Sequence, residues 1–330
     1  MCLVRFMGMM RILSLALLPL LPFSLAAVSQ DAVAPSSPPA TAGSEGDTQT
    51  DEDTLTVDVD LVQVLFTVTD DDRQVPGLVE EDFIVYEDGV RQEIVSFEAE
   101  TDLPLTLVVA MDTSGSVRTK LEFEQDAAVE FFFTVIERRR DEGMLVTFDS
   151  SVQVLQDFTD SPERLSEAVR QIRVGGSSSM YDAIYLAIAQ KVAQRPEGGR
   201  RIMVVVSDGD DNSSEKTLEE ALEVAQRNDV VIYTISTNST ADFGADRQER
   251  GDRLLEELAE ETGGRSFYPL ELEDLVETLE GIVSELRSQY EITYVSSNPA
   301  RDGAFREIEI RPCDGGHSIN ARAGYYAPLD

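Results

Sequence analysis

An acid and two hydroxyl side chains stand at alternate positions directly after a run of aliphatic residues. The stretch is LTLVVAMDTSGS, residues 105–116, and the three side chains are Asp112, Ser114 and Ser116. A turn needs no such order, because Gly, Asn or Pro forms turns readily. Carboxylate and hydroxyl oxygens in a tight loop suit a metal ion, and such a loop can also hold a phosphoryl group. The stretch therefore predicts a ligand site, with an ordinary polar loop as the alternative.

Two further polar loops are predicted to reach the same edge of a sheet. SDGDDN, which contains Asp208, follows the apolar run RIMVVV, and GGSSSMYDAI, which contains Ser178, precedes a helix expected to begin near Tyr181. Ligands of a doubly wound sheet bind beyond the carboxyl ends of its strands. Oxygen donors without nitrogen or sulfur suit Mg²⁺, Mn²⁺ or Ca²⁺. For Asp210, Asp211 and Asn212, we expect solvation at the rim and capping of the helix that follows rather than direct ligation.

The elements that must position these loops alternate between strand and helix. Apolar strands are predicted at residues 105–111, 144–148, 202–206 and 230–235. Between them apolar side chains recur at helical spacing, and Thr217 with Glu220 forms the pattern of a capping box. Strands that are apolar throughout imply a parallel sheet covered on both faces. We predict an α/β fold with a doubly wound, mostly parallel, Rossmann-like sheet over residues 102–288.

Alternating apolar and polar residues predict β strands on both sides of this segment. The N-terminal β segment covers residues 54–101 and contains a hairpin signal at Asp88-Gly89. The C-terminal β segment covers residues 289–330 and contains a turn signal at Asp302-Gly303. Because the termini of a domain are often close in space, we expect the two segments to pack together as a small accessory β domain.

The first residues of the chain have the layout of a secretory signal peptide. A basic residue, Arg11, precedes an apolar run, and the small residues Ala26 and Ala27 follow it. The run is short for a membrane span, so we expect cleavage after residues 1–27 and no stable span afterwards, with a retained anchor as the alternative. Residues 28–53 are rich in Pro, Ser, Thr and acids, which predicts a disordered linker. The protein is expected to be secreted or periplasmic.

The composition of the chain excludes several kinds of partner and site. With 63 acidic and 27 basic residues, the formal net charge is -36, so the surface repels nucleic acid and anionic membranes. Two cysteines and one histidine are too few for a Cys/His zinc site. A Ser-His-Asp triad would have to use His317, which stands in the turn-rich stretch PCDGGHS.

The three loops resemble those of von Willebrand factor type A (VWA) domains, over residues 102–288. The resemblance implies a metal-ion-dependent adhesion site (MIDAS), in which Asp-x-Ser-x-Ser, a Thr from a second loop and an Asp from a third surround the ion. Matched by position, the ligands are Asp112, Ser114, Ser116, Ser178 and Asp208. Ser178 departs from the family's Thr and lacks the methyl group that restricts the rotamer. The stretches VDVDLVQV, PGLVEEDFIVYEDG and GYYAP resemble an exported bacterial subgroup of this family.

The resemblance implies a protein-binding module rather than an enzyme. A divalent cation, in the first place Mg²⁺, would keep one coordination position open for an Asp or Glu side chain of an unidentified partner protein. An envelope scaffold with a silent or empty metal site is the first alternative. A haloacid-dehalogenase-type phosphatase is the second, because that class also places an acid after the first strand. Its proton-donating second Asp would fall on Ser114, which cannot act as that acid near neutral pH.

Overall fold

The computed structural model describes the chain from residue 61 onward, with short gaps. The described residues are 61–70, 73–99, 103–196, 199–238, 245–269, 272–287, 289–313 and 315–329. The expected signal peptide and linker lie outside them, so both remain predictions.

A sheet of six strands forms the centre of the segment that carries the three loops, in the order β11-β10-β9-β6-β7-β8. The strands are β6 (Leu105–Asp112), β7 (Glu142–Phe148), β8 (Val152–Thr159), β9 (Arg200–Ser207), β10 (Val230–Ser236) and β11 (Ser266–Phe267). Neighbouring strands pair in parallel, except that β8 is antiparallel to β7. The predicted α/β fold with a mostly parallel sheet is confirmed. The apolar pattern did not predict β8, which is half-exposed, or β11, which has two residues.

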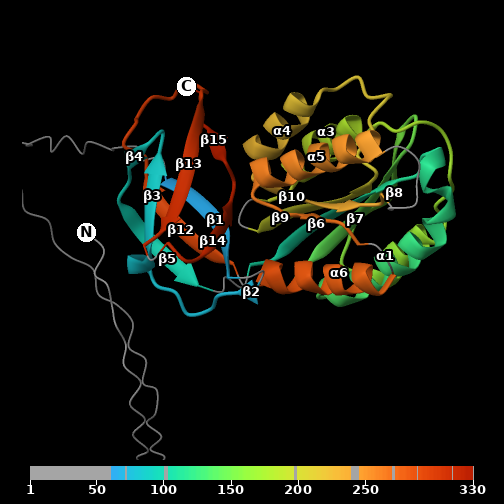
Figure 1. Cartoon of the computed structure of the whole chain (residues 1–330), viewed down its shortest axis with the longest axis horizontal. Helices are drawn as coiled ribbons and strands as arrows, with labels where there is room; N and C mark the ends of the chain where they lie inside the picture. The colour runs from blue at the N-terminus through green and yellow to red at the C-terminus, as the bar shows by residue number, and fades with distance from the viewer. Residues whose placement is uncertain are drawn as a thin grey trace, which may run out of the picture. The chain divides into compact units, whose positions relative to one another are not determined.

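Helices cover both faces of this sheet (Figure 1). The helices α1 (Leu121–Val135), α2 (Pro162–Val169) and α6 (Leu272–Arg287) pack in one buried cluster. The helices α3 (Met180–Gln190), α4 (Leu218–Arg227) and α5 (Ala245–Thr262) pack in the other. Along β6, Leu107 and Val109 belong to the first cluster, whereas Val108 and Ala110 belong to the second. Both faces of the strand are buried, which is why its sequence is apolar without alternation.

The ends of two helices follow local sequence signals. At the start of α4, the Thr217 hydroxyl accepts the Glu220 N–H at 3.2 Å and the Glu220 carboxylate accepts the Thr217 N–H at 3.0 Å, which confirms the predicted capping box. After α5 the chain turns at Gly263, whose φ of +83° favours glycine. Among the described residues, no helix has the length and apolar character needed to cross a membrane.

The remaining strands form two further sheets (Figure 1). One has the order β14-β1-β12-β5, with β2 also paired to β1, and the other has the order β15-β13-β3-β4. The strands are β1 (Leu61–Asp70), β2 (Arg73–Gln74), β3 (Phe83–Glu87), β4 (Val90–Arg91), β5 (Ile94–Ala99), β12 (Tyr290–Val295), β13 (Phe305–Pro312), β14 (Ser318–Ala321) and β15 (Gly324–Tyr326). Strands that precede the central segment therefore pair with strands that follow it: β1 with β12 and β14, and β3 with β13.

One buried cluster joins these two sheets. Its aromatic members include Phe66, Phe83 and Tyr290, and the Phe66 and Phe83 rings meet edge to face with their centroids 5.0 Å apart. The hairpin between β3 and β4 turns at Asp88 (φ 49°) and Gly89 (φ 74°), as the Asp-Gly signal predicts. The stretch HSINARAGYY reads as one alternating strand in the sequence, but it is divided between β14 and β15, which lie in different sheets.

Candidate metal centre

Strand β6 carries Asp112 to the carboxyl edge of the central sheet. The strand lies between β9 and β7, so the loops that follow these strands surround its end. The Asp112 side chain is almost fully buried, with 1% exposure. Burial raises the pKa of Asp112, and the nearby charge of Asp208 adds to the rise, whereas hydrogen bonds from Ser114 and Ser207 oppose it.

Three donors, two from loops and one from the end of β9, meet the Asp112 carboxylate. The Ser114 N–H donates to Oδ1 at 2.7 Å. The hydroxyls of Ser178 and Ser207 both donate to Oδ2, at 3.1 and 2.9 Å. Ser207 was not among the predicted site residues, although it ends the apolar run directly before Asp208 and is fully buried. A hydroxyl at the carboxyl end of a buried strand was the available sequence signal.

The alternating hydroxyls of the first loop lie side by side. The Ser114 and Ser116 hydroxyl oxygens are 2.9 Å apart, with Ser114 buried and Ser116 exposed to solvent. Thr113, between Asp112 and Ser114, instead donates its hydroxyl at 3.1 Å to the carbonyl of Phe148, the last residue of β7. The short 3-10 helix η2 (Gly115–Thr119) follows and leads into α1. The Ser114 and Ser116 hydroxyls therefore lie together, whereas the Thr113 hydroxyl is bonded to β7.

The second loop is held against the third. The Ser178 N–H donates to the Asn212 side-chain oxygen at 3.2 Å, and the Asn212 N–H donates to the Ser178 carbonyl at 3.1 Å. Ser178 is buried, with 2% exposure. The structure therefore brings Ser178 to Asp112, at the position where the resemblance expects the second loop to contribute a hydroxyl.

Asp208 is half-buried, and its negative charge acts on the buried Asp112 carboxylate. Its electrostatic interaction with Asp112 helps to raise the pKa of Asp112. Its Oδ1 accepts the Asp210 N–H at 3.1 Å, and its backbone carbonyl accepts the Asn238 amide at 3.1 Å. The carboxylate is thus fixed within its own loop, close to Asp112 but not hydrogen-bonded to the serine hydroxyls.

Asp211 caps a helix. Its Oδ2 accepts the Tyr181 N–H at 2.9 Å and the Ser214 hydroxyl at 2.6 Å. Tyr181 lies in the first turn of α3, so the cap belongs to the helix that precedes the loop in sequence, not to α4, which follows it. Asp182 of α3 in turn accepts the backbone N–H groups of Glu215 and Lys216. These bonds join the start of α3 to the third loop.

Two glycines let α5 approach the Asp208 loop. A Cβ atom on Gly251, in α5, would lie 2.2 Å from the Asp208 carbonyl oxygen, and one on Gly209 would lie 2.3 Å from the Gly251 carbonyl oxygen. Gly209 also has φ +76°. The backbone of the loop therefore packs directly on the backbone of the helix, and the sequence analysis did not foresee the part played by Gly251.

Glu124, in the first turn of α1, is a buried acid that interacts electrostatically with Asp112 and Asp208. It is 4% exposed, and neither of its carboxylate oxygens has a hydrogen-bond partner. Burial raises the pKa of Glu124 to about 8; Asp112 and Asp208 add to the rise, and Lys120 opposes it. The sequence analysis missed this residue. The available signal was an acid on the same helix face as the apolar residues Ala128 and Phe131.

Without a divalent cation, the stability of the chain is expected to fall as the pH rises from about 5 to about 8. The pKa of Glu124 is about 8 in the folded chain against an ordinary value of 4.5. Between these values the folded state keeps a proton that the unfolded state has lost, so the unfolding free energy decreases with pH. The raised pKa of Asp112 acts with the same sign. Urea unfolding at several pH values, after removal of divalent cations, measures this decline.

Glu124→Gln is expected to flatten that decline, because the variant has no ionisable group at this position. Glu122→Gln is the matched control, since Glu122 lies two residues away on the same helix and is exposed. The control should keep the wild-type slope. An identical slope in Glu124→Gln and the wild type would contradict the assignment.

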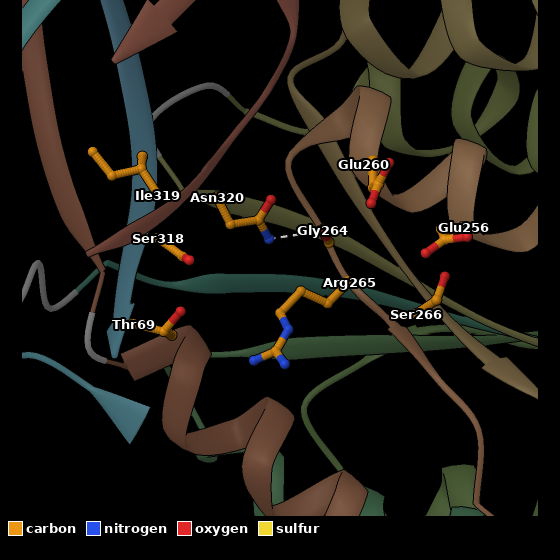
Figure 2. Close-up of a pocket in the computed structure, with 9 residues that line it drawn as sticks. All are labelled: Thr69, Glu256, Glu260, Gly264, Arg265, Ser266, Ser318, Ile319 and Asn320. Carbon is orange, nitrogen blue, oxygen red and sulfur yellow. Dashed lines mark hydrogen bonds between the residues drawn. The ribbon is translucent and has the colours of Figure 1, made fainter. Parts of the chain in front are cut away.

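A separate polar pocket of about 480 Å³ is lined by none of the predicted site residues (Figure 2). It is lined by Thr69, Glu256, Glu260, Gly264, Arg265, Ser266, Ser318, Ile319 and Asn320. The Asn320 amide donates to the Gly264 carbonyl at 2.7 Å, and the Arg265 guanidinium lies 3.6 Å from the Glu285 carboxylate. The first contact joins β14 to the turn before β11, and the second joins that turn to α6. The pocket is distinct from the candidate centre.

Comparisons with known proteins place the central segment in a family. The human von Willebrand factor A domain-containing protein 3B is 25% identical over 167 residues, which are 49% of this chain and 12% of that protein. An uncharacterised protein of Borreliella burgdorferi is 23% identical over 197 residues, which are 54% of this chain and 56% of that protein. The chain therefore spans less than two thirds of the length of either relative.

A solved von Willebrand factor type A structure from Catenulispora acidiphila is similar with a TM-score of 0.49 and 13% identity, over 82% of this chain and 74% of that chain. The model of the von Willebrand factor type A domain family matches residues 106–284. This range covers more than half of the chain and includes all three loops of the candidate centre. The chain belongs to the von Willebrand factor type A domain family.

Proposed function

We propose that the protein is an exported, metal-ion-dependent protein-binding module. Its MIDAS-like centre would use Asp112, Ser114, Ser116, Ser178 and Asp208 to hold one divalent cation. The observation that carries the proposal is the convergence of Ser114, Ser178 and Ser207, from three separate parts of the chain, on the Asp112 carboxylate. The exposed Ser116 hydroxyl lies 2.9 Å from that of Ser114 and gives the centre a side open to solvent.

The donor chemistry suits a hard divalent cation. Carboxylate and hydroxyl oxygens are the ligands that Mg²⁺ prefers, and Mn²⁺ and Ca²⁺ accept the same donors. The buried, unpaired Glu124 carboxylate close to Asp112 and Asp208 supports the fit, because a cation would offset the repulsion among these acids. Serine hydroxyls ligate without neutralising the ion, which leaves it able to attract a further anionic group.

The partner is proposed to be a protein that presents an Asp or Glu side chain. The formal net charge of -36 repels other acidic surfaces in general. A cation held between two carboxylates turns one chosen contact into an attraction, so binding would be both specific and metal-dependent. Export is supported by the signal-peptide layout before residue 28.

A binding role is preferred to phosphatase chemistry because of what surrounds Asp112. The residue two positions after it is Ser114, whose hydroxyl lies beside the Ser116 hydroxyl. A proton-donating carboxylic acid is needed at that position for the phosphatase mechanism. The other side chains on the Asp112 carboxylate are the hydroxyls of Ser178 and Ser207, neither of which can serve as that acid near neutral pH.

Thermal unfolding of the full chain in EDTA, and then in Mg²⁺, Mn²⁺ or Ca²⁺, tests the metal-binding part. A cation at 100 times its Kd should stabilise the folded state by about 2.7 kcal/mol. An unchanged midpoint with every cation would rule the proposal out and favour the scaffold with a silent or empty site.

Selection from a displayed peptide library in Mg²⁺, with elution by EDTA, tests the protein-binding part. Enriched peptides should share an Asp or Glu, and replacing that residue by Asn or Gln should abolish binding. Stabilisation by Mg²⁺ without any EDTA-released peptide would also favour the scaffold.

A further inference from the structure

Glu124 is a buried acid that the proposed ligand set does not use. It lies in the first turn of α1, eight residues after Ser116, and is 4% exposed. Both carboxylate oxygens lack a hydrogen-bond partner. Buried polar groups are almost always satisfied, and a buried carboxylate without a partner is costly. Such a group points to a ligand that would satisfy it.

The charges around Glu124 show what kind of ligand would do so. Its carboxylate interacts with two other acids, Asp112 at the end of β6 and Asp208 after β9, and with the ammonium group of Lys120. The Lys120 ammonium also donates to the Thr237 carbonyl after β10. Three acids, from α1, from the end of β6 and from the loop after β9, therefore interact with one another, and the Lys120 ammonium group interacts with Glu124. A divalent cation together with Lys120 would balance their charge.

We propose that Glu124 is a further acidic member of the cation site, which holds the ion through its charge and accepts hydrogen bonds from water bound to it. This inference rests on the proposed metal-binding function. Within the part of the chain that the structure describes, no group of three or more His, Cys, Asp or Glu side chains is spaced to ligate one ion. Glu124 would act through water, while the direct ligands remain those of the proposed ligand set. Mg²⁺ usually keeps several of its waters in protein sites, which provides the donors that Glu124 lacks.

If Glu124 acts through water, replacing it should weaken the affinity of the chain for the cation. Groups that orient the direct ligands and the waters of a metal site change metal affinity by about 10- to 100-fold when they are replaced. Glu124→Gln keeps the size of the side chain and removes its charge. Since Glu124 has no hydrogen bond to lose, the variant should be at least as stable as the wild type in EDTA and should bind the cation less tightly.

Calorimetric titration of the full chain with Mg²⁺ alone tests this inference, using the wild type, Glu124→Gln, Glu124→Asp and Glu122→Gln. The Kd for Mg²⁺ should rise about tenfold or more in Glu124→Gln. Glu124→Asp keeps the charge and should recover part of the affinity. The exposed Glu122 is on the same helix, and Glu122→Gln should match the wild type. Thermal unfolding in EDTA should give Glu124→Gln a midpoint no lower than that of the wild type.

Two results would overturn the inference and leave the proposed function intact. One is a wild-type chain that binds Mg²⁺ and a Glu124→Gln variant with the same Kd. The other is equal weakening in Glu124→Gln and Glu124→Asp together with a lower midpoint in EDTA, which would identify a packing role. A wild-type chain that neither binds Mg²⁺ nor is stabilised by it would overturn the proposed function, and this inference with it.

Discussion

Replacing Asp112 with Ala is expected to abolish the stabilisation of the folded chain by a divalent cation. The variant loses the carboxylate around which Ser114, Ser178 and Ser207 are arranged. The wild type should gain about 2.7 kcal/mol at a cation concentration of 100 Kd, which raises the unfolding midpoint by about 5 to 10 °C for a domain of this size. The variant should show no shift. Thermal unfolding in EDTA and in saturating Mg²⁺ measures the difference.

Two further variants make this result specific. Asp112→Asn keeps an oxygen acceptor for the buried hydroxyls, so it should fold more stably than Asp112→Ala while still failing to respond to the cation. Asp211→Ala removes the acceptor for the Tyr181 N–H at the start of α3 and should cost about 1 kcal/mol in stability. It should nevertheless retain the Mg²⁺ response. Equal loss of the response in Asp112→Ala and Asp211→Ala would show that the ligands have been assigned to the wrong loop.

Gly251→Ala is expected to destabilise the chain and to weaken cation binding together. Its new Cβ would lie 2.2 Å from the Asp208 carbonyl oxygen, and this backbone atom can move only if the loop or α5 moves. Overpacking of this kind costs about 1–3 kcal/mol. Because the Asp208 carboxylate belongs to the displaced loop, the Kd for Mg²⁺ should rise as well. Urea unfolding and Mg²⁺ titration of the same preparation measure the two effects.

Gly281→Ala is the matched control for this substitution. Gly281 also lies within a helix, α6, and a Cβ atom there would meet nothing within 4 Å. Replacing a helical glycine by alanine in open space should stabilise the chain by about 0.5–1 kcal/mol and should leave the Kd for Mg²⁺ unchanged. If Gly251→Ala behaved like Gly281→Ala, the contact between α5 and the Asp208 loop would have no energetic importance.

The sequence by itself determined the features that depend on neighbouring residues or on burial of whole elements. The apolar run before Asp112 predicts β6, because a strand buried on both faces must be apolar throughout. The Thr217 and Glu220 capping box and the Asp88-Gly89 hairpin also follow from the sequence, because each forms between residues a few positions apart. The half-exposed edge strand β8 was not predicted, because its composition is mixed.

Only the tertiary structure decided how the side chains of the candidate centre are used. Ser207 and Asp112 are hydrogen-bonded across 95 residues of sequence, and Asp211 caps α3 across 30. Such contacts depend on which strands become neighbours and on how closely the loops approach. The same holds for Gly251, whose role comes from backbone contact with Asp208, and for Glu124, whose burial against the other acids comes from the packing of α1. Local patterns specify elements and their ends, whereas long-range packing decides which polar groups share one buried space.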